Sequence, residues 1–206
     1  MAEITGITPQ VKDKTRCNIE VDGRFYCGMK LETVMKNRLK VGACVDGESL
    51  SRLQLESEKT TALDKALTHI SASMKTEMQI RAFLRKKGYL NDVCDYVVEK
   101  MREYSFLNDG EYARAYAESA GKKRGRRLIA LELRKKGVDE ESIEKALSDL
   151  SGEKESAINA LNKYMRGKQI DRKTLSKGYA YLIGKGYDYD TAKEALSAFG
   201  DTEDED

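Results

Sequence analysis

The spacing of apolar and polar positions changes along the chain, from strand-like to helical. Residues 1–28 are expected to form strands, and stretches 15–21 and 24–27 flank Asp22-Gly23, a strong hairpin signal. A simple two-residue turn would put Ile19 and Phe25 on opposite faces. We favour a type I turn with a bulge at Gly23, because it places one apolar set on one face, namely Cys17, Ile19, Phe25 and Cys27.

Helical spacing follows the hairpin. Residues Leu31–Leu39 predict one helix, and a further short helix is expected over Glu48–Leu55. Residues 1–57 therefore read as a small β-rich cap with short helices. Nothing in this segment resembles a catalytic constellation.

From about Thr60 onward the chain repeats with a period of 49 residues. Gly88, Gly137 and Gly186 mark the period, in the segments LRKKGY, LRKKGV and LIGKGY. Other columns align as well, among them Leu84, Leu133 and Leu182, then Lys87, Lys136 and Lys185, then Val98, Leu147 and Leu196. Repeats of this length indicate stacked helical units.

Each repeat predicts three helices. Their expected ranges are 61–71, 76–87 and 91–104, then 109–120, 126–136 and 140–150, then 153–166, 172–183 and 189–199. The repeated glycine should end the second helix of each unit at positive φ. The expected N-caps of the third helices are Asn91, Asp139 and Asp188.

The predicted fold is therefore mainly α. Three tandem three-helix repeats are expected to form an elongated curved array behind an N-terminal cap that contains the β-hairpin. The expected segments are 1–57 for the cap, 58–105, 106–150 and 151–200 for the repeats, and 201–206 for an acidic disordered tail.

Composition fits this picture and narrows the chemistry. Charged residues make up 35% of the chain, with one proline and no tryptophan, which favours exposed helices over a loop-rich β fold. The four cysteines are scattered and His69 has no plausible ligand neighbours, so neither a metal site nor a cofactor is expected. We expect no signal peptide, no membrane span and no disulfide, as in a reduced cytoplasmic protein.

Charge is distributed unevenly. The net charge is +2, but five of the last six residues are acidic, so the rest of the chain is strongly basic. A solubilising tail is the simple interpretation, and competition with an anionic ligand for a basic surface is the functional one.

The most basic segment is Gly121–Gly137, GKKRGRRLIALELRKKG, with eight lysines and arginines and a single acid, Glu132. Its apolar residues, Leu128, Ile129, Leu131 and Leu133, are expected on one side of a helix that Gly125 opens. The simpler interpretation is a solvated charged face with no binding role. So dense a run also creates a field that attracts polyanions or acidic protein surfaces.

Catalytic patterns are not found. The chain has no P-loop, no G-x-S-x-G and no H-E-x-x-H, and its single histidine has no candidate nucleophile beside it. We therefore expect no enzyme.

The second repeat resembles the RecX family of bacterial RecA modulators. The likeness rests on Asn108-Asp109, Tyr112-Ala113, Gly125, Ile129, Glu132-Leu133 and Lys136-Gly137-Val138, together with IRAFLRKKGY at 80–89 and the Asp22-Gly23 hairpin. It covers essentially the whole chain and is weaker in the third repeat. Position 126 carries Arg where the family usually has proline.

The resemblance implies a monomer that lies in the groove of the RecA–single-stranded DNA filament and lowers ATP hydrolysis, strand exchange and co-protease activity. The implied contacts to RecA or DNA, single-stranded or also double-stranded, are the cations Lys122, Lys123, Arg124, Arg126, Arg127, Arg134, Lys135 and Lys136, with Arg81, Arg85, Lys86 and Lys87.

Four alternatives stay open. The lysines before the repeated glycines could merely suit helix C-termini. Tyr112 and Tyr116 could stack on bases, although their column predicts core positions. The whole chain could instead bind DNA directly without RecA, or be a structural adaptor unrelated to recombination.

Overall fold

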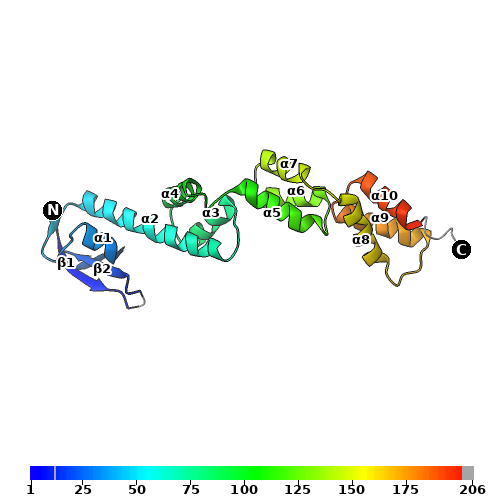
Figure 1. Ribbon diagram of the computed structural model, residues 1–206. Helices are drawn as coiled ribbons and strands as arrows, with labels where there is room; N and C mark the ends of the chain where they lie inside the picture. The colour runs from blue at the N-terminus through cyan, green and yellow to red at the C-terminus, as the bar shows by residue number, and fades with distance from the viewer. Residues whose placement is uncertain (12, 201–206) are drawn as a thin grey trace. The chain divides into compact units, whose positions relative to one another are not determined.

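The computed structural model describes residues 1–11 and 13–200 (Figure 1). These residues divide into two compact units. The first unit holds Met1–Met74 and Ile80–Leu107. The second holds Lys75–Gln79 and residues 108–200. The predicted acidic tail, 201–206, lies outside the described residues.

A four-stranded antiparallel sheet opens the first unit. Its strands are β1 (Ala2–Pro9), β2 (Arg16–Val21), β3 (Arg24–Lys30) and β4 (Cys44–Val45), in the order β3-β2-β1-β4. The two-residue strand β4 was not predicted. Helix α1 (Leu31–Lys36) and the start of α2 share a core with the sheet, built from Ile4, Cys17, Ile19, Cys27, Met29, Val34 and Leu50.

The β2–β3 turn differs from the predicted one. Asp22 and Gly23 both have positive φ, 48° and 76°, so they form a two-residue turn that matches the twist of the strands. Glu20 consequently lies opposite Phe25. The expectation that Phe25 joins the apolar face was wrong, since its side chain is 66% exposed.

The strand pair does contain a bulge, but it lies at Tyr26 and not at Gly23, where it was predicted. Tyr26 is the extra residue, because the register shifts between the Glu20–Phe25 and Ile19–Cys27 pairs. Cys17, Ile19 and Cys27 therefore share the buried face as predicted. Both cysteines are free thiols, and burial raises the pKa of Cys27 to about 11.

Helix α2 (Gly47–Ser71) is continuous, whereas two separate helices were predicted. The apolar pattern fades in the middle of α2 because that part of the helix faces polar groups of the sheet. The Ser57 hydroxyl, fully buried, accepts the backbone N–H of Lys30 at 2.7 Å. The Thr61 hydroxyl accepts a bond from Arg16 at 2.7 Å. The predicted boundary after residue 57 falls inside this helix.

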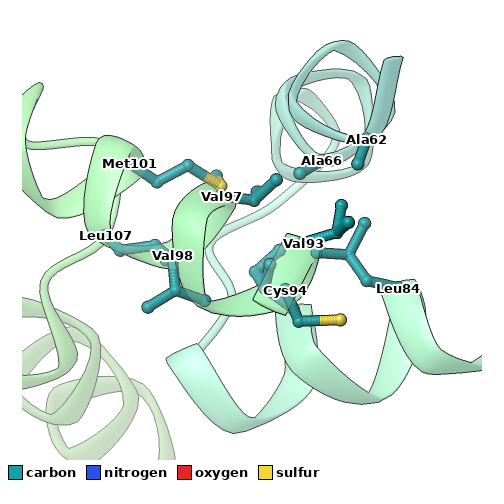
Figure 2. Packing of buried hydrophobic residues seen from close by; sticks show 10 residues of the cluster. Ala62, Ala66, Leu84, Val93, Cys94, Val97, Val98, Met101 and Leu107 are labelled. Atoms are coloured by element: carbon teal, nitrogen blue, oxygen red, sulfur yellow. The ribbon is translucent and has the colours of Figure 1, made fainter. Parts of the chain in front are cut away.

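The second half of α2 packs with α3 (Glu77–Lys86) and α4 (Asn91–Glu103). Figure 2 shows Ala62 and Ala66 of α2 facing the apolar side chains of α4, with Leu84 of α3 beside them. The small alanines let the helices approach closely. This cluster is the core of the first three-helix bundle.

Two further bundles lie in the second unit. One contains α5 (Asp109–Gly121), α6 (Arg126–Lys135) and α7 (Glu140–Ser148). The other contains α8 (Glu153–Met165), α9 (Arg172–Gly184) and α10 (Tyr189–Gly200). These helices, with α3 and α4, begin and end within two residues of the predicted positions.

The repeated glycines end the second helices as predicted, with φ of 88° at Gly88, 84° at Gly137 and 89° at Gly186. The next helix is capped by an aspartate in two bundles. Asp139 accepts the N–H of Ser142 at 2.9 Å, and Asp188 that of Thr191 at 2.7 Å.

The first bundle departs from this capping pattern. The expected cap Asn91 is already helical, and the N-cap is Leu90, which makes no side-chain bond. Asn91 instead accepts a bond from Arg85 at 3.2 Å. Leu90 occupies the repeat position of the two capping aspartates, so the prediction missed the repeat register by one residue.

A close backbone contact joins α6 to the turn that follows α9. The Gly125 N–H donates to the Lys185 carbonyl at 3.0 Å, and the Arg127 N–H to the Gly186 carbonyl at 3.1 Å. These are groups that helix ends leave without helical partners. A Cβ on Gly125 would lie 2.2 Å from the Gly186 oxygen, and one on Gly186 would lie 2.3 Å from the Leu128 Cβ.

The same contact recurs one repeat earlier within the second unit. The Thr76 hydroxyl donates to the Lys136 carbonyl at 2.6 Å, and a Cβ on Gly137 would lie 2.6 Å from that of Met78. Thr76 and Lys136 are the period-49 equivalents of Gly125 and Lys185. A lysine–glycine turn thus docks on a helix N-terminus twice; we call this contact the turn–helix joint.

Replacing Gly125 by Ala should lower the free energy of unfolding of the second unit by about 1–3 kcal/mol, because the new methyl meets backbone atoms that cannot rotate away. Gly184→Ala is the control, since its Cβ meets nothing within 4 Å and should leave stability unchanged or slightly higher. Urea unfolding measures both. Equal stability of the two variants would contradict the joint.

Candidate partner-binding surface

The basic segment Gly121–Gly137 forms the loop after α5, helix α6 and the glycine turn. The buried side of α6 carries Ile129, Ala130 and Leu133. Leu131 was expected there but is 45% exposed. Two residues along a helix are about 200° apart, which puts Leu131 on the side opposite Ile129.

Arg124 is bound inside its own bundle. Its guanidinium donates to Glu132 at 2.6 Å and to the Tyr116 hydroxyl at 3.1 Å, and that hydroxyl donates to Glu132 at 2.7 Å. Burial and the bond to Glu132 raise the pKa of Tyr116. Tyr112 and Tyr116 belong to the bundle core or pack against it, as the repeat column predicted. Arg124 therefore links α6 to α5.

Arg126 holds the two bundles of the second unit together. Its backbone N–H donates to Glu153 at 2.9 Å, its guanidinium pairs with the same carboxylate, and it also donates to the Leu150 carbonyl at 2.6 Å. A proline at this position would have no N–H and no guanidinium. Arg126 thus contributes to the junction between the bundles.

Three more cations of the segment contact groups of this chain. Arg134 pairs with Glu140 through two nitrogens, and this bond lowers the pKa of the Glu140 carboxyl. The Lys136 ammonium lies 5.3 Å from the ring of Tyr116, and the Arg127 guanidinium lies 5.5 Å from that of Tyr189.

Lys122, Lys123 and Lys135 are exposed and form no ion pair with the described residues. Lys135 ends a line of exposed side chains along α6. Arg127, Leu131 and Lys135 are spaced four apart, so they stand one above another on the helix. We call these three residues the α6 stripe.

The predicted cations of the first unit show the same division. Arg81 pairs with Asp95, and Arg85 donates to Asn91. The Lys87 ammonium lies 5.7 Å from the ring of Phe83. Lys86 is exposed and forms no ion pair with the described residues. The structure therefore assigns many predicted binding residues a contact within the fold.

Residues 1–11 and 13–200 contain no helix that is both long and apolar enough to cross a membrane. The same residues contain no cluster of three or more histidine, cysteine, aspartate or glutamate side chains that could hold a metal ion.

Three family models match this chain in sequence order. They describe the regulatory protein RecX N-terminal domain over residues 2–46, the RecX first three-helix domain over 62–101 and the RecX second three-helix domain over 108–147. Together the matched ranges cover more than half of the chain.

Curated relatives and solved structures agree with these matches. The regulatory protein RecX of Clostridium botulinum strain Eklund 17B is 32% identical over 95% of each chain, and that of Bacillus subtilis is 29% identical over all of this chain and 80% of its own length. A crystal structure of regulatory protein RecX aligns with a TM-score of 0.71 at 25% identity, covering 94% of this chain and 98% of that one. RecX from Lactobacillus salivarius has a similar fold, with a TM-score of 0.62 over 68% of this chain and 96% of that one.

Two variants that each remove one positive charge distinguish a cation that stabilises the fold from a cation that is free on the surface. Arg124→Gln should lower the free energy of unfolding by about 1 kcal/mol, because it leaves Glu132 without its guanidinium. Lys135→Gln, with the same charge change on an exposed residue, should stay within about 0.5 kcal/mol of wild type. Thermal or urea unfolding measures both; an R124Q protein as stable as K135Q would place Arg124 among the free surface cations.

Proposed function

This chain belongs to the RecX family of regulatory proteins, which implies a regulatory role toward RecA, and we propose a specific form of that role. The chain binds the filament that RecA forms on single-stranded DNA and lowers its ATPase, strand-exchange and co-protease activities. It acts as a monomer in the cytoplasm and performs no chemistry of its own.

The composition of the α6 stripe supports a protein as the binding partner. Leu131 is exposed between two cations, Arg127 and Lys135. Protein interfaces combine apolar contacts with arginine at their centres. A surface that bound only phosphates would gain nothing from an exposed leucine at this place. The stripe therefore suits a mixed apolar and acidic surface of RecA.

The small number of free cations supports the same choice. In the segment Gly121–Gly137, the internal contacts of Arg124, Arg126 and Arg134 leave few charges for phosphates. With three or four phosphate contacts, DNA affinity would fall only roughly 40- to 150-fold between 50 and 200 mM salt. Tight binding to bare DNA is not expected from so few contacts.

Direct DNA binding without RecA is the second candidate. The exposed loop lysines Lys122 and Lys123 favour it, and three-helix units can place a helix in a DNA groove. On this account RecA is dispensable, and added DNA should compete for the protein. The two functions therefore differ in their response to excess DNA.

The test is the single-stranded-DNA-dependent ATPase of RecA, with this protein below the RecA concentration and DNA in excess. Filament binding predicts strong inhibition at a small molar ratio. Competition for DNA predicts that inhibition disappears as DNA is added. Binding to bare DNA without any inhibition would contradict the proposed function and favour the second candidate.

The triple variant Lys122→Glu, Lys123→Glu and Lys135→Glu should raise the protein concentration needed for half-inhibition by about tenfold or more, because it reverses the free cations near α6. The control reverses three other exposed lysines of the second unit, Lys173, Lys177 and Lys193, and should inhibit as wild type. Circular dichroism checks that both remain helical. Equal inhibition by the two triple variants would show that inhibition depends on the net charge of the protein and not on the lysines near α6.

A further inference from the structure

The turn at Gly88 is the third copy of the lysine–glycine turn, and it is open. In the other two copies a Cβ on the glycine would lie within 2.6 Å of a helix N-terminus. A Cβ on Gly88 would meet nothing within 4 Å. The φ angles of the three glycines agree within a few degrees, so the open turn already has the docking conformation.

The docked copies show what such a turn binds. In each one a lysine carbonyl at the end of a helix accepts a hydrogen bond from the N-terminus of another helix, from the Gly125 N–H or from the Thr76 hydroxyl. Helix C-termini carry negative partial charge and N-termini positive, so the arrangement is also electrostatically favourable. A side chain of the partner helix's first turn, Leu128 or Met78, covers the glycine.

Leu90 is a second, independent observation at the same place. The side chain is 74% exposed, and it occupies the N-cap position of α4, where it makes no hydrogen bond. The equivalent residues Asp139 and Asp188 both cap their helices. The first bundle therefore carries an exposed apolar residue at a position where a polar residue would stabilise the helix. Departures from a locally favourable residue are typical of binding sites.

We propose that the Gly88 turn and Leu90 form a docking site for the N-terminal turn of a helix on a protein partner. The site repeats in trans the turn–helix joint that the second unit makes within the chain. The carbonyl of Lys87 would accept the bond, and the partner's first turn would cover Gly88 and contact Leu90. The identity of the partner rests on the proposed function, which makes it RecA.

The test uses a substitution whose effects on stability and on binding have opposite signs. Leu90→Asn supplies the missing cap, with the N–H of Val93 as its donor, so the melting temperature should rise. The same change removes the apolar contact, so affinity for RecA–single-stranded DNA filaments should fall about tenfold in a co-sedimentation assay. Leu90→Ser should act in the same two directions.

Val41→Asn is the matched control, because Val41 is another exposed apolar residue of the first unit, 61% exposed. It should bind filaments as wild type does. A Leu90→Asn protein that is more stable and still binds like wild type would overturn the docking site alone.

Two other results would also overturn it. A wild-type chain that did not sediment with filaments would overturn the proposed function and the docking site together. Analytical ultracentrifugation could also show that the wild-type chain self-associates and that Leu90→Asn abolishes this. The partner at the docking site would then be a second copy of this chain and not RecA.

Discussion

The packing of the second unit depends on hydrogen bonds between backbone groups at helix ends, which have no partners within their own helices. The N–H groups of Gly125 and Arg127, at the start of α6, have no partners in their own helix. They bond across the turn–helix joint to the carbonyls of Lys185 and Gly186, in the turn after α9. Only glycine at 125 and 186 lets the two backbones come close enough. A bundle of this size buries only a small core and is marginally stable alone, so the turn–helix joint adds stability that the cores do not provide.

The joint and the ion pairs around it decide which cations are available to a partner. Arg124 stabilises its own bundle, and Arg126 links that bundle to Glu153 of the next. The basic segment thus serves the fold first, and the surface left over is a short line of Arg127, Leu131 and Lys135 with a pair of lysines in the preceding loop. A surface of this composition suits recognition of a protein better than that of a phosphate backbone.

Periodicity in the sequence predicted most of the helices, because the repeated glycines and the apolar columns act locally. Prediction failed where distant groups set the local structure. The sequence predicted two helices where α2 is one, because Ser57 and Thr61 interrupt the apolar pattern. Both residues face the sheet as hydrogen-bond acceptors. Likewise, charge density alone could not separate Arg124 and Arg126 from Lys135, because their carboxylate partners are brought near by folding. The sequence indicates only that Gly125 opens a helix, whereas the close approach of the Gly186 backbone requires glycine there.

Hydroxyl-radical footprinting tests whether the α6 stripe and the Gly88 turn both face RecA. Radicals oxidise exposed side chains, so Leu131 and Leu90 report on the two places, and the exposed Met35 of α1 is the internal reference. Binding to RecA filaments on single-stranded DNA should protect both leucines and leave Met35 unchanged, whereas bare single-stranded DNA should protect neither. Protection of Met35 with both leucines still oxidised would show that RecA covers neither the α6 stripe nor the Gly88 turn.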